Sequence, residues 1–281
     1  MKNVIIMFIA FVFVLAFFIG QCNDDTQYIS YEETVEQQIE HNNIEEKRNE
    51  YDEGPIRSVE IPSIPIDIQE QILLRKAYTV SYNKDTKCPN WVAWELTSSH
   101  ADGDCPRYSK YDEDMEVPAP RATNEDYRGS GWTRGHMCPA GDNKWDAEAM
   151  RESNLLSNMC PQHASLNSGL WNVIERDCRK WAVKYGDVYI VCGPVFLNKE
   201  HETIGMNKVV VPEAFFKVIL RLTPEPAAIG FVVRNNEGKK KKDQFVNTVD
   251  DVERITGMDF FPALPDSIEN SVEATASLYN W

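Results

Sequence analysis

Acidic charge is concentrated at the front of this chain, and that distribution limits which residues can build a hydrophobic core. Residues 23–70 carry 14 Asp and Glu against 3 Lys and Arg, a net charge of −11, whereas residues 71–281 carry 30 acidic and 25 basic residues. A polar segment of like charge buries too little apolar surface to offset the entropy of ordering it. We therefore expect an acidic tether over residues 22–70 and one folded domain over residues 71–281.

The first 21 residues have the pattern of an export signal. Lys2 supplies a positive start, residues 4–19 are an uncharged apolar run, and acidic sequence follows at once. A membrane anchor is the competing interpretation, because the run is barely long enough to span a bilayer. No Lys/Arg cluster follows the run, which favours a signal peptide over residues 1–21. We expect an exported protein that is periplasmic, secreted or an outer-membrane lipoprotein.

Seven cysteines give the exported chain an odd count, which requires one exception to pairing. Cys22 ends the apolar stretch, at the place of the acylated cysteine of a bacterial lipoprotein, although Gln21 is bulkier than the usual residue there. A lipid on Cys22 would attach the protein to a membrane. The other six cysteines are enough for three disulfides in an oxidising compartment.

The folded part shows mixed helix and strand patterns without regular alternation of the two. Short aromatic and β-branched runs predict strands, and a segment rich in Asp, Gly and Pro predicts a loop over residues 98–130. A helix over residues 248–257 has Thr248 as N-cap and Gly257 as C-cap. These patterns favour an α+β fold over a doubly wound sheet. The expected strands are residues 77–83, 90–97, 187–196, 208–222 and 227–235, and the other expected helices are residues 144–156 and 166–186.

The helix expected over residues 166–186 carries four residues spaced four apart: Asn167, Trp171, Glu175 and Arg179. This spacing places them along one ridge, which Trp171 can anchor to the body of the protein. Taken alone, the ridge indicates a solvated helix face with an ordinary Glu–Arg pair.

Three stretches around this ridge resemble one family. They are APRATNEDYRGSGWTRGHMCPAGDNKW (119–145), NLLSNMCPQHASLNSGLWNVIE (154–175) and ITGMDFFPALP (255–265). Together they resemble the DNA/RNA non-specific endonucleases, the ββα-metal nucleases that include endonuclease G and exported bacterial nucleases. The lead-in to His136 is most like the endonuclease G branch. The resemblance spans about residues 75–265 and implies the ββα-metal (His-Me finger) fold, a central antiparallel sheet flanked by helices.

The resemblance also implies roles for the residues at the matching positions. His136, on a strand end where Gly135 removes bulk, would be the general base, because histidine titrates near neutral pH. Asn167 would be the one direct protein ligand of a divalent ion, Mg²⁺ or alternatively Mn²⁺. Glu175 would hold water around that ion. Arg134 and Arg179 would bind the phosphate and the charge of the transition state, completing the catalytic set.

Further positions carry weaker implications. Asn158 would support the catalytic residues as a polar neighbour, and Arg121 and Arg128 would contact the nucleic-acid backbone. Thr133 departs from the family pattern, which usually has aspartate before Arg-Gly-His. We expect activity to persist, with altered hydrogen bonding around His136.

The cysteines close to these motifs suggest pairings among the fifteen that six cysteines allow. A Cys138–Cys160 bridge would join the two active-site segments. Cys178 with Cys192, and Cys88 with Cys105, are the other pairs we expect.

The function that follows is an exported, Mg²⁺-dependent endonuclease that cleaves DNA and RNA without sequence preference, through contacts to the phosphate backbone. Two alternatives remain open: a catalytically weak protein- or nucleic-acid-binding module on the same fold, and a secreted toxin nuclease. Endonuclease G relatives are often dimers, so a homodimer is a further expectation.

Overall fold

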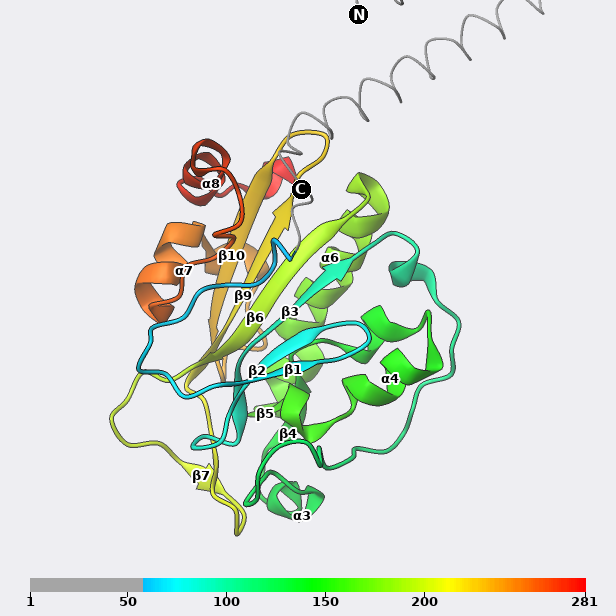
Figure 1. Ribbon diagram of the computed structural model, residues 1–281, viewed down its shortest axis with the longest axis vertical. Helices are drawn as coiled ribbons and strands as arrows, with labels where there is room; N and C mark the ends of the chain where they lie inside the picture. The colour runs from blue at the N-terminus through cyan, green and yellow to red at the C-terminus, as the bar shows by residue number, and fades with distance from the viewer. Residues whose placement is uncertain (1–57) are drawn as a thin grey trace, which may run out of the picture. The chain divides into compact units, whose positions relative to one another are not determined.

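A seven-stranded antiparallel sheet forms the centre of the computed structural model, which describes residues 58–281 (Figure 1). The predicted signal peptide, Cys22 and the tether up to residue 57 lie outside the described residues. No helix among residues 58–281 is both long and apolar enough to cross a membrane. In sheet order the strands are β1 (Gln71–Leu74), β2 (Thr79–Asn83), β3 (Cys88–Leu96), β6 (Val188–Val195), β9 (Ala214–Arg221), β10 (Ala227–Arg234) and β11 (Val246–Asn247).

Two small hairpins and several helices surround the sheet. One two-stranded sheet pairs β4 (Thr133–His136) with β5 (Met159–Gln162), and another pairs β7 (Thr203–Ile204) with β8 (Val209–Val210). The α-helices are α3 (Asn124–Tyr127), α4 (Ala147–Ser153), α5 (Ala164–Leu166), α6 (Asn172–Tyr185), α7 (Val249–Thr256) and α8 (Asp266–Glu273). Single helical turns are η1 (His100–Asp102), η2 (Ala140–Asn143), η3 (Leu156–Asn158), the π-turn η4 (Asn167–Trp171), η5 (Lys242–Phe245) and η6 (Leu278–Asn280).

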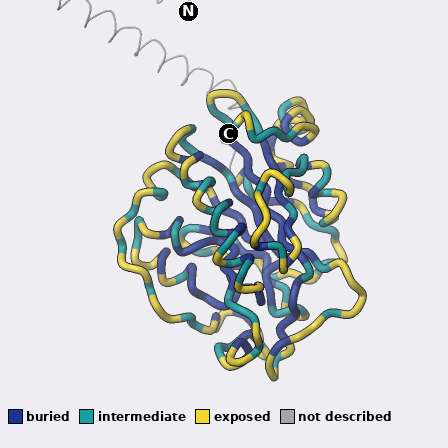
Figure 2. Tube along the Cα trace, turned by 180° about the vertical axis from the view of Figure 1, so that it is seen from behind, coloured by how far each residue is buried: buried dark blue, intermediate teal, exposed yellow. Residues whose placement is uncertain are grey.

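Both faces of the sheet are covered, so its central strands are apolar on both sides. In β9, Phe215 and Ile219 enter the hydrophobic cluster that contains α6, whereas Phe216 and Val218 enter the cluster that contains α7 and α8. Successive side chains of a strand point to opposite faces, which is why neighbouring residues join different clusters. Figure 2 shows these strands as a buried centre inside exposed loops.

The structure confirms the α+β fold with its central antiparallel sheet. Helix α7 also begins and ends as expected. Thr248 Oγ1 accepts a hydrogen bond from Asp251 N at 3.1 Å, and Gly257 lies in the left-handed region at φ 73°. These caps depend only on neighbouring residues, so the sequence was sufficient to place them.

Two expected elements are interrupted. The strand expected over residues 208–222 is divided between β8 and β9, with Pro212, which has no backbone N–H for a ladder, in the gap. The helix expected over residues 166–186 is kinked at Gly169, whose φ of −101° and ψ of −112° are not helical. The backbone of Gly238 lies against that point, and Leu170 N donates to Gly238 O at 3.1 Å.

Residues 58–70, the last part of the expected tether, contact the folded domain. Val59 is fully buried in the cluster under α7 and α8. Ser63 and Asp259 exchange two backbone hydrogen bonds at 2.8 and 3.0 Å. Residues 61–65, which contain Pro62 and Pro65, therefore pack on the domain and pair with it through this β-bridge.

The six cysteines within the described residues are all free thiols, and none of the three expected disulfides is present. Cys138 and Cys192 are held by other contacts instead. Cys138 Sγ accepts a hydrogen bond from Asn143 Nδ2 at 3.3 Å, and Cys192 Sγ donates to Met137 O at 3.2 Å. Burial raises the pKa of both thiols, so neither is activated as a nucleophile.

Candidate active site

A cleft of about 290 Å³ brings together residues from distant parts of the chain. His136 ends β4, η2 forms one wall, and η4 and α6 supply the residues opposite. Asn167, Glu175 and Arg179, which the sequence placed on one helix ridge, all reach this cleft. The complete lining is Arg107, His136, Pro139, Ala140, Gly141, Asn167, Ser168, Asn172, Glu175 and Arg179.

His136 is held at the cleft by the β4–β5 hairpin, in which it pairs with Met159. A Cβ atom on the preceding Gly135 would lie 2.4 Å from Gln162 Oε1, so only glycine fits there. The imidazole is 8 % exposed, and burial lowers its pKa to about 4, with a smaller contribution from Arg107. The ring is therefore neutral at physiological pH and able to accept a proton.

The hydrogen bonds of Asn154 determine which ring nitrogen of His136 is free. Asn154 Nδ2 donates to Met150 O at 3.1 Å, which turns Oδ1 toward the imidazole. His136 Nε2 lies 3.1 Å from Asn154 Oδ1, an oxygen that can only accept. The proton consequently resides on Nε2, and Nδ1 carries the lone pair.

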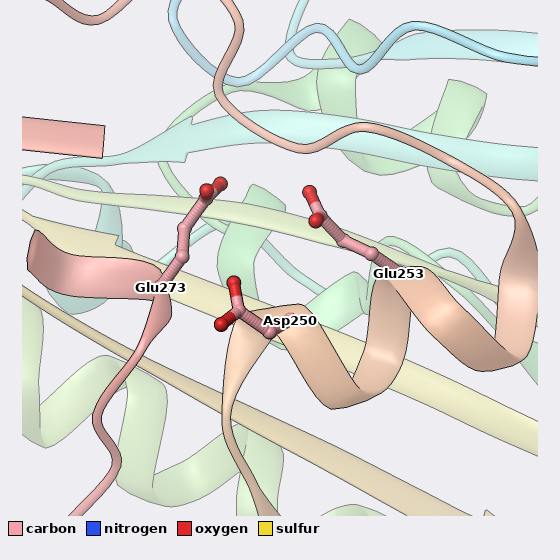
Figure 3. A group of neighbouring side chains, drawn as sticks. All are labelled: Asp250, Glu253 and Glu273. Carbon is pink, nitrogen blue, oxygen red and sulfur yellow. The ribbon is translucent and has the colours of Figure 1, made fainter. Parts of the chain in front are cut away.

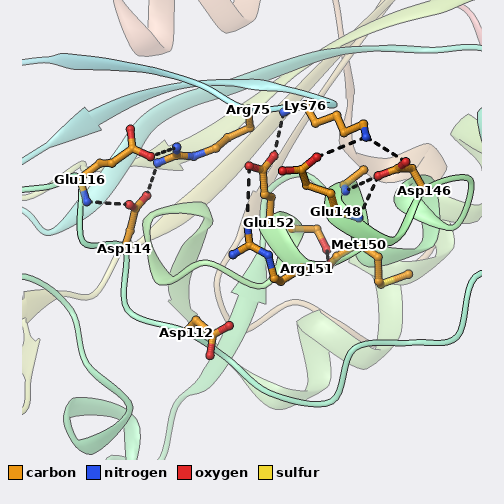
Figure 4. Close-up of polar contacts among 12 residues, drawn as sticks. Arg75, Lys76, Asp112, Asp114, Glu116, Asp146, Glu148, Met150, Arg151 and Glu152 are labelled. Carbon is orange, nitrogen blue, oxygen red and sulfur yellow. Dashed lines mark hydrogen bonds and ion pairs between the residues drawn. The ribbon is translucent and has the colours of Figure 1, made fainter.

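Asn154 is the C-cap of α4, and a polar network ties that helix to the turn after β1 (Figure 4). Lys76 N donates to Glu152 Oε2 at 2.7 Å, and Lys76 Nζ pairs with Asp146 Oδ2 at 2.9 Å. In the same turn, Arg75 pairs with Asp114 at 2.5 Å in the loop that precedes α3. The network thereby fixes the end of α4 that orients His136.

Asn167 is oriented by Thr133, the position where the chain departs from the family pattern. Asn167 Nδ2 donates to Thr133 Oγ1 at 3.0 Å and lies 3.4 Å from Arg134 O. Thr133 Oγ1 itself donates to Gln162 O at 2.7 Å, so its lone pairs face the amide. The amide nitrogen is thereby occupied, and the amide oxygen of Asn167 has no partner among the described residues. Thr133 thus acts on Asn167 rather than on His136.

Glu175 presents a carboxylate to the cleft with no hydrogen bond or ion pair from the described residues. Burial raises its pKa to about 7, Lys217 and Arg179 lower it, and Asp142 raises it. A group in this environment ionises near neutral pH, and a cation in the cleft would favour its charged form.

Arg179 reaches the cleft from α6 and is held by a buried carboxylate. Its Nη1 pairs with Asp142 Oδ1 at 2.6 Å, and Trp94 Nε1 donates to the other oxygen of Asp142 at 3.1 Å. A Cβ on Gly141 would lie 2.7 Å from Arg179 Nη1, so glycine leaves room for the guanidinium. The side chain is 21 % exposed, which leaves it accessible to an anion.

Two basic residues near the cleft were not found from the sequence. Arg107 lines the cleft from the long loop after β3, where no local pattern marks it. Lys217 is fully buried, and its Nζ lies 4.9 and 4.7 Å from the ring centroids of Trp94 and Trp171 without a hydrogen-bond partner. A single lysine within the apolar run AFFKVILR was the available signal for this second residue.

Trp171 anchors the kinked helix, as the sequence suggested. Its side chain is fully buried, and its Nε1 donates to His136 O at 3.3 Å. The centroid of its ring lies 5.6 Å from that of Phe215. The same residue therefore links the helix that carries Glu175 to the strand that carries His136.

The other expected site residues lie outside the cleft lining. Arg134 is half-buried between the rings of Tyr111 and Tyr127, and its Nη2 donates to Asn124 O at 3.0 Å. Asn158 is fully buried, accepts from Cys138 N at 2.9 Å, and donates to two backbone carbonyls, so it joins chain segments rather than facing a ligand.

Arg121 and Arg128, expected to contact nucleic-acid backbone, have protein partners. Arg121 Nη1 donates to Val117 O at 2.6 Å. Arg128 pairs with Glu125 at 2.9 Å, and its side chain is 77 % exposed. Neither lines the cleft, although the exposed Arg128 can exchange its weak surface pair for another anion.

Comparison with known proteins places this geometry in a family. Residues 57–267 match the family described as DNA/RNA non-specific endonuclease. Over 208 residues the chain is 39 % identical to the mitochondrial nuclease EXOG of Mus musculus, covering 68 % of this chain and 56 % of that protein. The chain therefore spans little more than half the length of that relative. Over 207 residues it is 34 % identical to mitochondrial endonuclease G of Homo sapiens, covering 68 % of this chain and 70 % of the relative.

A solved structure shares the fold. It is titled as the crystal structure of the EndoG/EndoGI complex and the mechanism of EndoG inhibition. The TM-score is 0.65 at 32 % identity, and the alignment covers 70 % of this chain and 88 % of that one. The family match over most of the chain, together with this fold, shows that the chain belongs to the DNA/RNA non-specific endonuclease family.

Proposed function

We propose that this chain is a divalent-metal-dependent endonuclease that hydrolyses phosphodiester bonds in DNA and RNA without sequence preference. The observation that carries the proposal is the cleft itself. It joins a neutral His136, the uncommitted amide oxygen of Asn167 and the unpaired carboxylate of Glu175 in one space.

The residues present fit a hydrated divalent ion, Mg²⁺ or Mn²⁺. Asn167 would be the direct ligand, since its nitrogen is held by Thr133 and its oxygen is not. Glu175 would hold water around the ion, because its carboxylate has no hydrogen-bond or ion-pair partner in the part of the chain that the structure describes. When bound, the ion supplies positive charge that polarises the phosphate and stabilises the departing oxygen.

The chain's own residues supply the proton transfer. His136 would remove the proton of the attacking water at Nδ1, the nitrogen left free by Asn154. The pKa of about 4 keeps this nitrogen available from mildly acidic pH upward. The low basicity that accompanies such a pKa would be offset as the anionic substrate enters, since a negative charge raises the pKa of histidine.

Basic residues at the cleft would bind the phosphate. Arg179 is positioned by Asp142 and retains donors that this pair does not use, and Arg107 lines the same cleft. Phosphate contacts carry no base information, so recognition through these side chains fits cleavage of both nucleic acids. Arg128, on the exposed surface, would add a backbone contact.

The proposal extends to the location and the assembly of the protein. The signal-like residues 1–21 support export, and Cys22 supports attachment by a lipid. The similarity to endonuclease G supports a homodimer. Membrane fractionation of cells expressing the chain and a Cys22→Ser variant tests the first two, and light scattering tests the third.

The decisive experiment is cleavage of plasmid DNA and of RNA, with Mg²⁺ and with EDTA, by the parent and by Asn167→Ala. We expect metal-dependent cutting of both substrates and loss of cutting in the variant. Asn172→Ala, which removes another asparagine of the same cleft, is the matched control and should retain most of the activity. If the folded parent binds nucleic acid but cuts neither substrate, the binding-module alternative replaces the proposal.

A further inference from the structure

Three carboxylates converge between α7 and α8, on the sheet face opposite the cleft. Asp250 and Glu253 come from α7 and Glu273 ends α8, and one oxygen from each lies within 4.8 Å of the others. Figure 3 shows the three side chains directed toward a shared space. We refer to them as the α7–α8 carboxylates.

Glu273 is the unusual member, because it is buried without a partner. Only 7 % of the residue is exposed, and its Oε1 has no hydrogen-bond partner among the described residues. Burial, followed by the negative charges of Glu253, Glu269 and Asp250, raises its pKa to about 8. A buried carboxyl group that lacks a hydrogen bond is costly, so such a group in a native fold calls for an explanation.

The surroundings supply only more negative charge. Asp259 and Glu269 add to the acidic field at this place. Within residues 58–281, no ion pair joins any of the α7–α8 carboxylates to a basic side chain. Arg254, in the same helix, pairs with Asp251 at 2.7 Å instead. Within residues 58–281, the neutralisation that remains possible is protonation or a bound cation.

The cluster is also held in place by the fold. Thr248 caps α7 two residues before Asp250, and Glu253 Oε1 accepts a hydrogen bond from Phe260 N at 2.8 Å. The carboxylates of Glu253 and Glu273 therefore cannot separate to relieve their repulsion as mobile surface side chains do. The carboxylate oxygens of this cluster have no basic partner among the described residues to compensate their negative charge. Such oxygens are the ligands that hard divalent cations take.

We propose that the α7–α8 carboxylates bind one Ca²⁺ ion, with Asp250, Glu253 and Glu273 as its protein ligands and water in the remaining positions. Ca²⁺ accepts six to eight oxygen ligands in flexible geometry, whereas Mg²⁺ usually takes one or two carboxylates and keeps its water. The bound ion neutralises the carboxyl group of Glu273 and joins the ends of α7 and α8. Since α7 and α8 pack on the sheet, the ion stabilises the fold rather than acting in catalysis.

The test measures thermal unfolding of the full-length chain with Ca²⁺ alone as the probe, in an Asn167→Ala background that removes the proposed metal ligand of the cleft. We expect Ca²⁺ well above its dissociation constant to raise Tm by on the order of 5 °C relative to EDTA. Calorimetric titration should give one ion bound per chain. Because the readouts are binding and stability, they do not depend on nuclease activity.

Two variants and one control locate the effect. Glu273→Gln, which preserves shape, and Asp250→Asn, at an exposed position, should each abolish most of the Ca²⁺-dependent shift. In EDTA above about pH 8, where Glu273 is charged, Glu273→Gln should unfold at an equal or higher temperature than the parent, because one buried repulsive charge is gone. Glu269→Gln removes a nearby charge that is not a ligand and should keep the shift. The proposal is overturned if Ca²⁺ does not raise the Tm of the parent. It is also overturned if Ca²⁺ raises the Tm of Glu273→Gln and Asp250→Asn as much as that of the parent.

Discussion

Two carboxylates on opposite faces of the same sheet, the half-buried Glu175 and the buried Glu273, differ in their neighbours. Burial raises the pKa of both, to about 7 for Glu175 and about 8 for Glu273. Near Glu175, Lys217 and Arg179 oppose this rise, whereas the charged groups that act most on Glu273 among the described residues are acidic. The cleft thus combines both signs of charge, and the α7–α8 carboxylates carry one sign alone.

This difference separates the ligands that each place accepts. A phosphate and a cation can be bound together in the cleft, because it offers arginine and carboxylate side chains side by side. The α7–α8 carboxylates would repel an anion and can be neutralised only by a proton or a cation. Variants that change the cleft or the α7–α8 carboxylates, and leave the other site intact, test this difference.

The largest effect is expected for His136→Ala, which removes the proposed base from the cleft. We expect kcat/KM to fall by about 10²- to 10⁴-fold, as is usual when a general base is lost. The measurement is initial rate of plasmid cleavage at saturating Mg²⁺. His201→Ala, whose imidazole pairs with Glu213 outside the cleft, should cleave at the parent rate. Equal rates in the parent and His136→Ala would remove this residue from the mechanism.

Thr133→Val should weaken metal binding in the cleft without altering the α7–α8 carboxylates. Valine keeps the shape of threonine but cannot accept the hydrogen bond from Asn167. Loss of a residue that orients a metal ligand typically costs about 10- to 100-fold in affinity. Activity as a function of Mg²⁺ concentration measures the change, and Thr133→Ser should retain the parent curve. An unchanged Mg²⁺ dependence in the valine variant contradicts the role assigned to Thr133.

Lys217→Met should raise the pKa of Glu175 toward that of Glu273. Lys217 lowers the pKa of Glu175, so a neutral side chain of similar length leaves that pKa above its present value of about 7. More Glu175 is then protonated near neutral pH, and activity should fall several-fold there but recover at alkaline pH. The pH–rate profile shows this as a shift of its acidic limb toward higher pH. A shift toward lower pH, or a loss independent of pH, would refute the electrostatic role.

The smallest effect is expected on the opposite face, for Thr248→Ala at the N-cap of α7. Removing the hydrogen bond to Asp251 N should lower the free energy of unfolding by about 1 kcal/mol. Urea denaturation measures this, and Thr248→Ser serves as the control. Cleavage well below the melting temperature should be unchanged, and a loss of cleavage there would show that the two faces are coupled.

Local patterns in the sequence accounted for much of the framework. The caps of α7 and the alternating strands β2, β3, β6 and β10 follow from neighbouring residues, and the structure has them near the expected positions. His136, Asn167, Glu175 and Arg179 do meet in one cleft. The short strand β1 had no comparable periodicity and was missed.

Long-range contacts accounted for what the sequence did not show. The kink at Gly169 arises where the backbone of Gly238, far along the chain, lies against the helix. Local helix propensity contains no information about that contact. Arg107 reaches the cleft from a loop whose path depends on ion pairs such as Arg75–Asp114.

The sequence by itself determined the chemical types available for the cleft: a histidine on a strand end, and an amide and a carboxylate on the following helix. Only the tertiary structure decided how those groups are used. In the folded chain Thr133 accepts a hydrogen bond from Asn167, Nδ1 of His136 is left free, and Glu273 is buried against α7. The reason is that orientation and pKa depend on neighbours in space, and these neighbours come from segments that are distant along the chain.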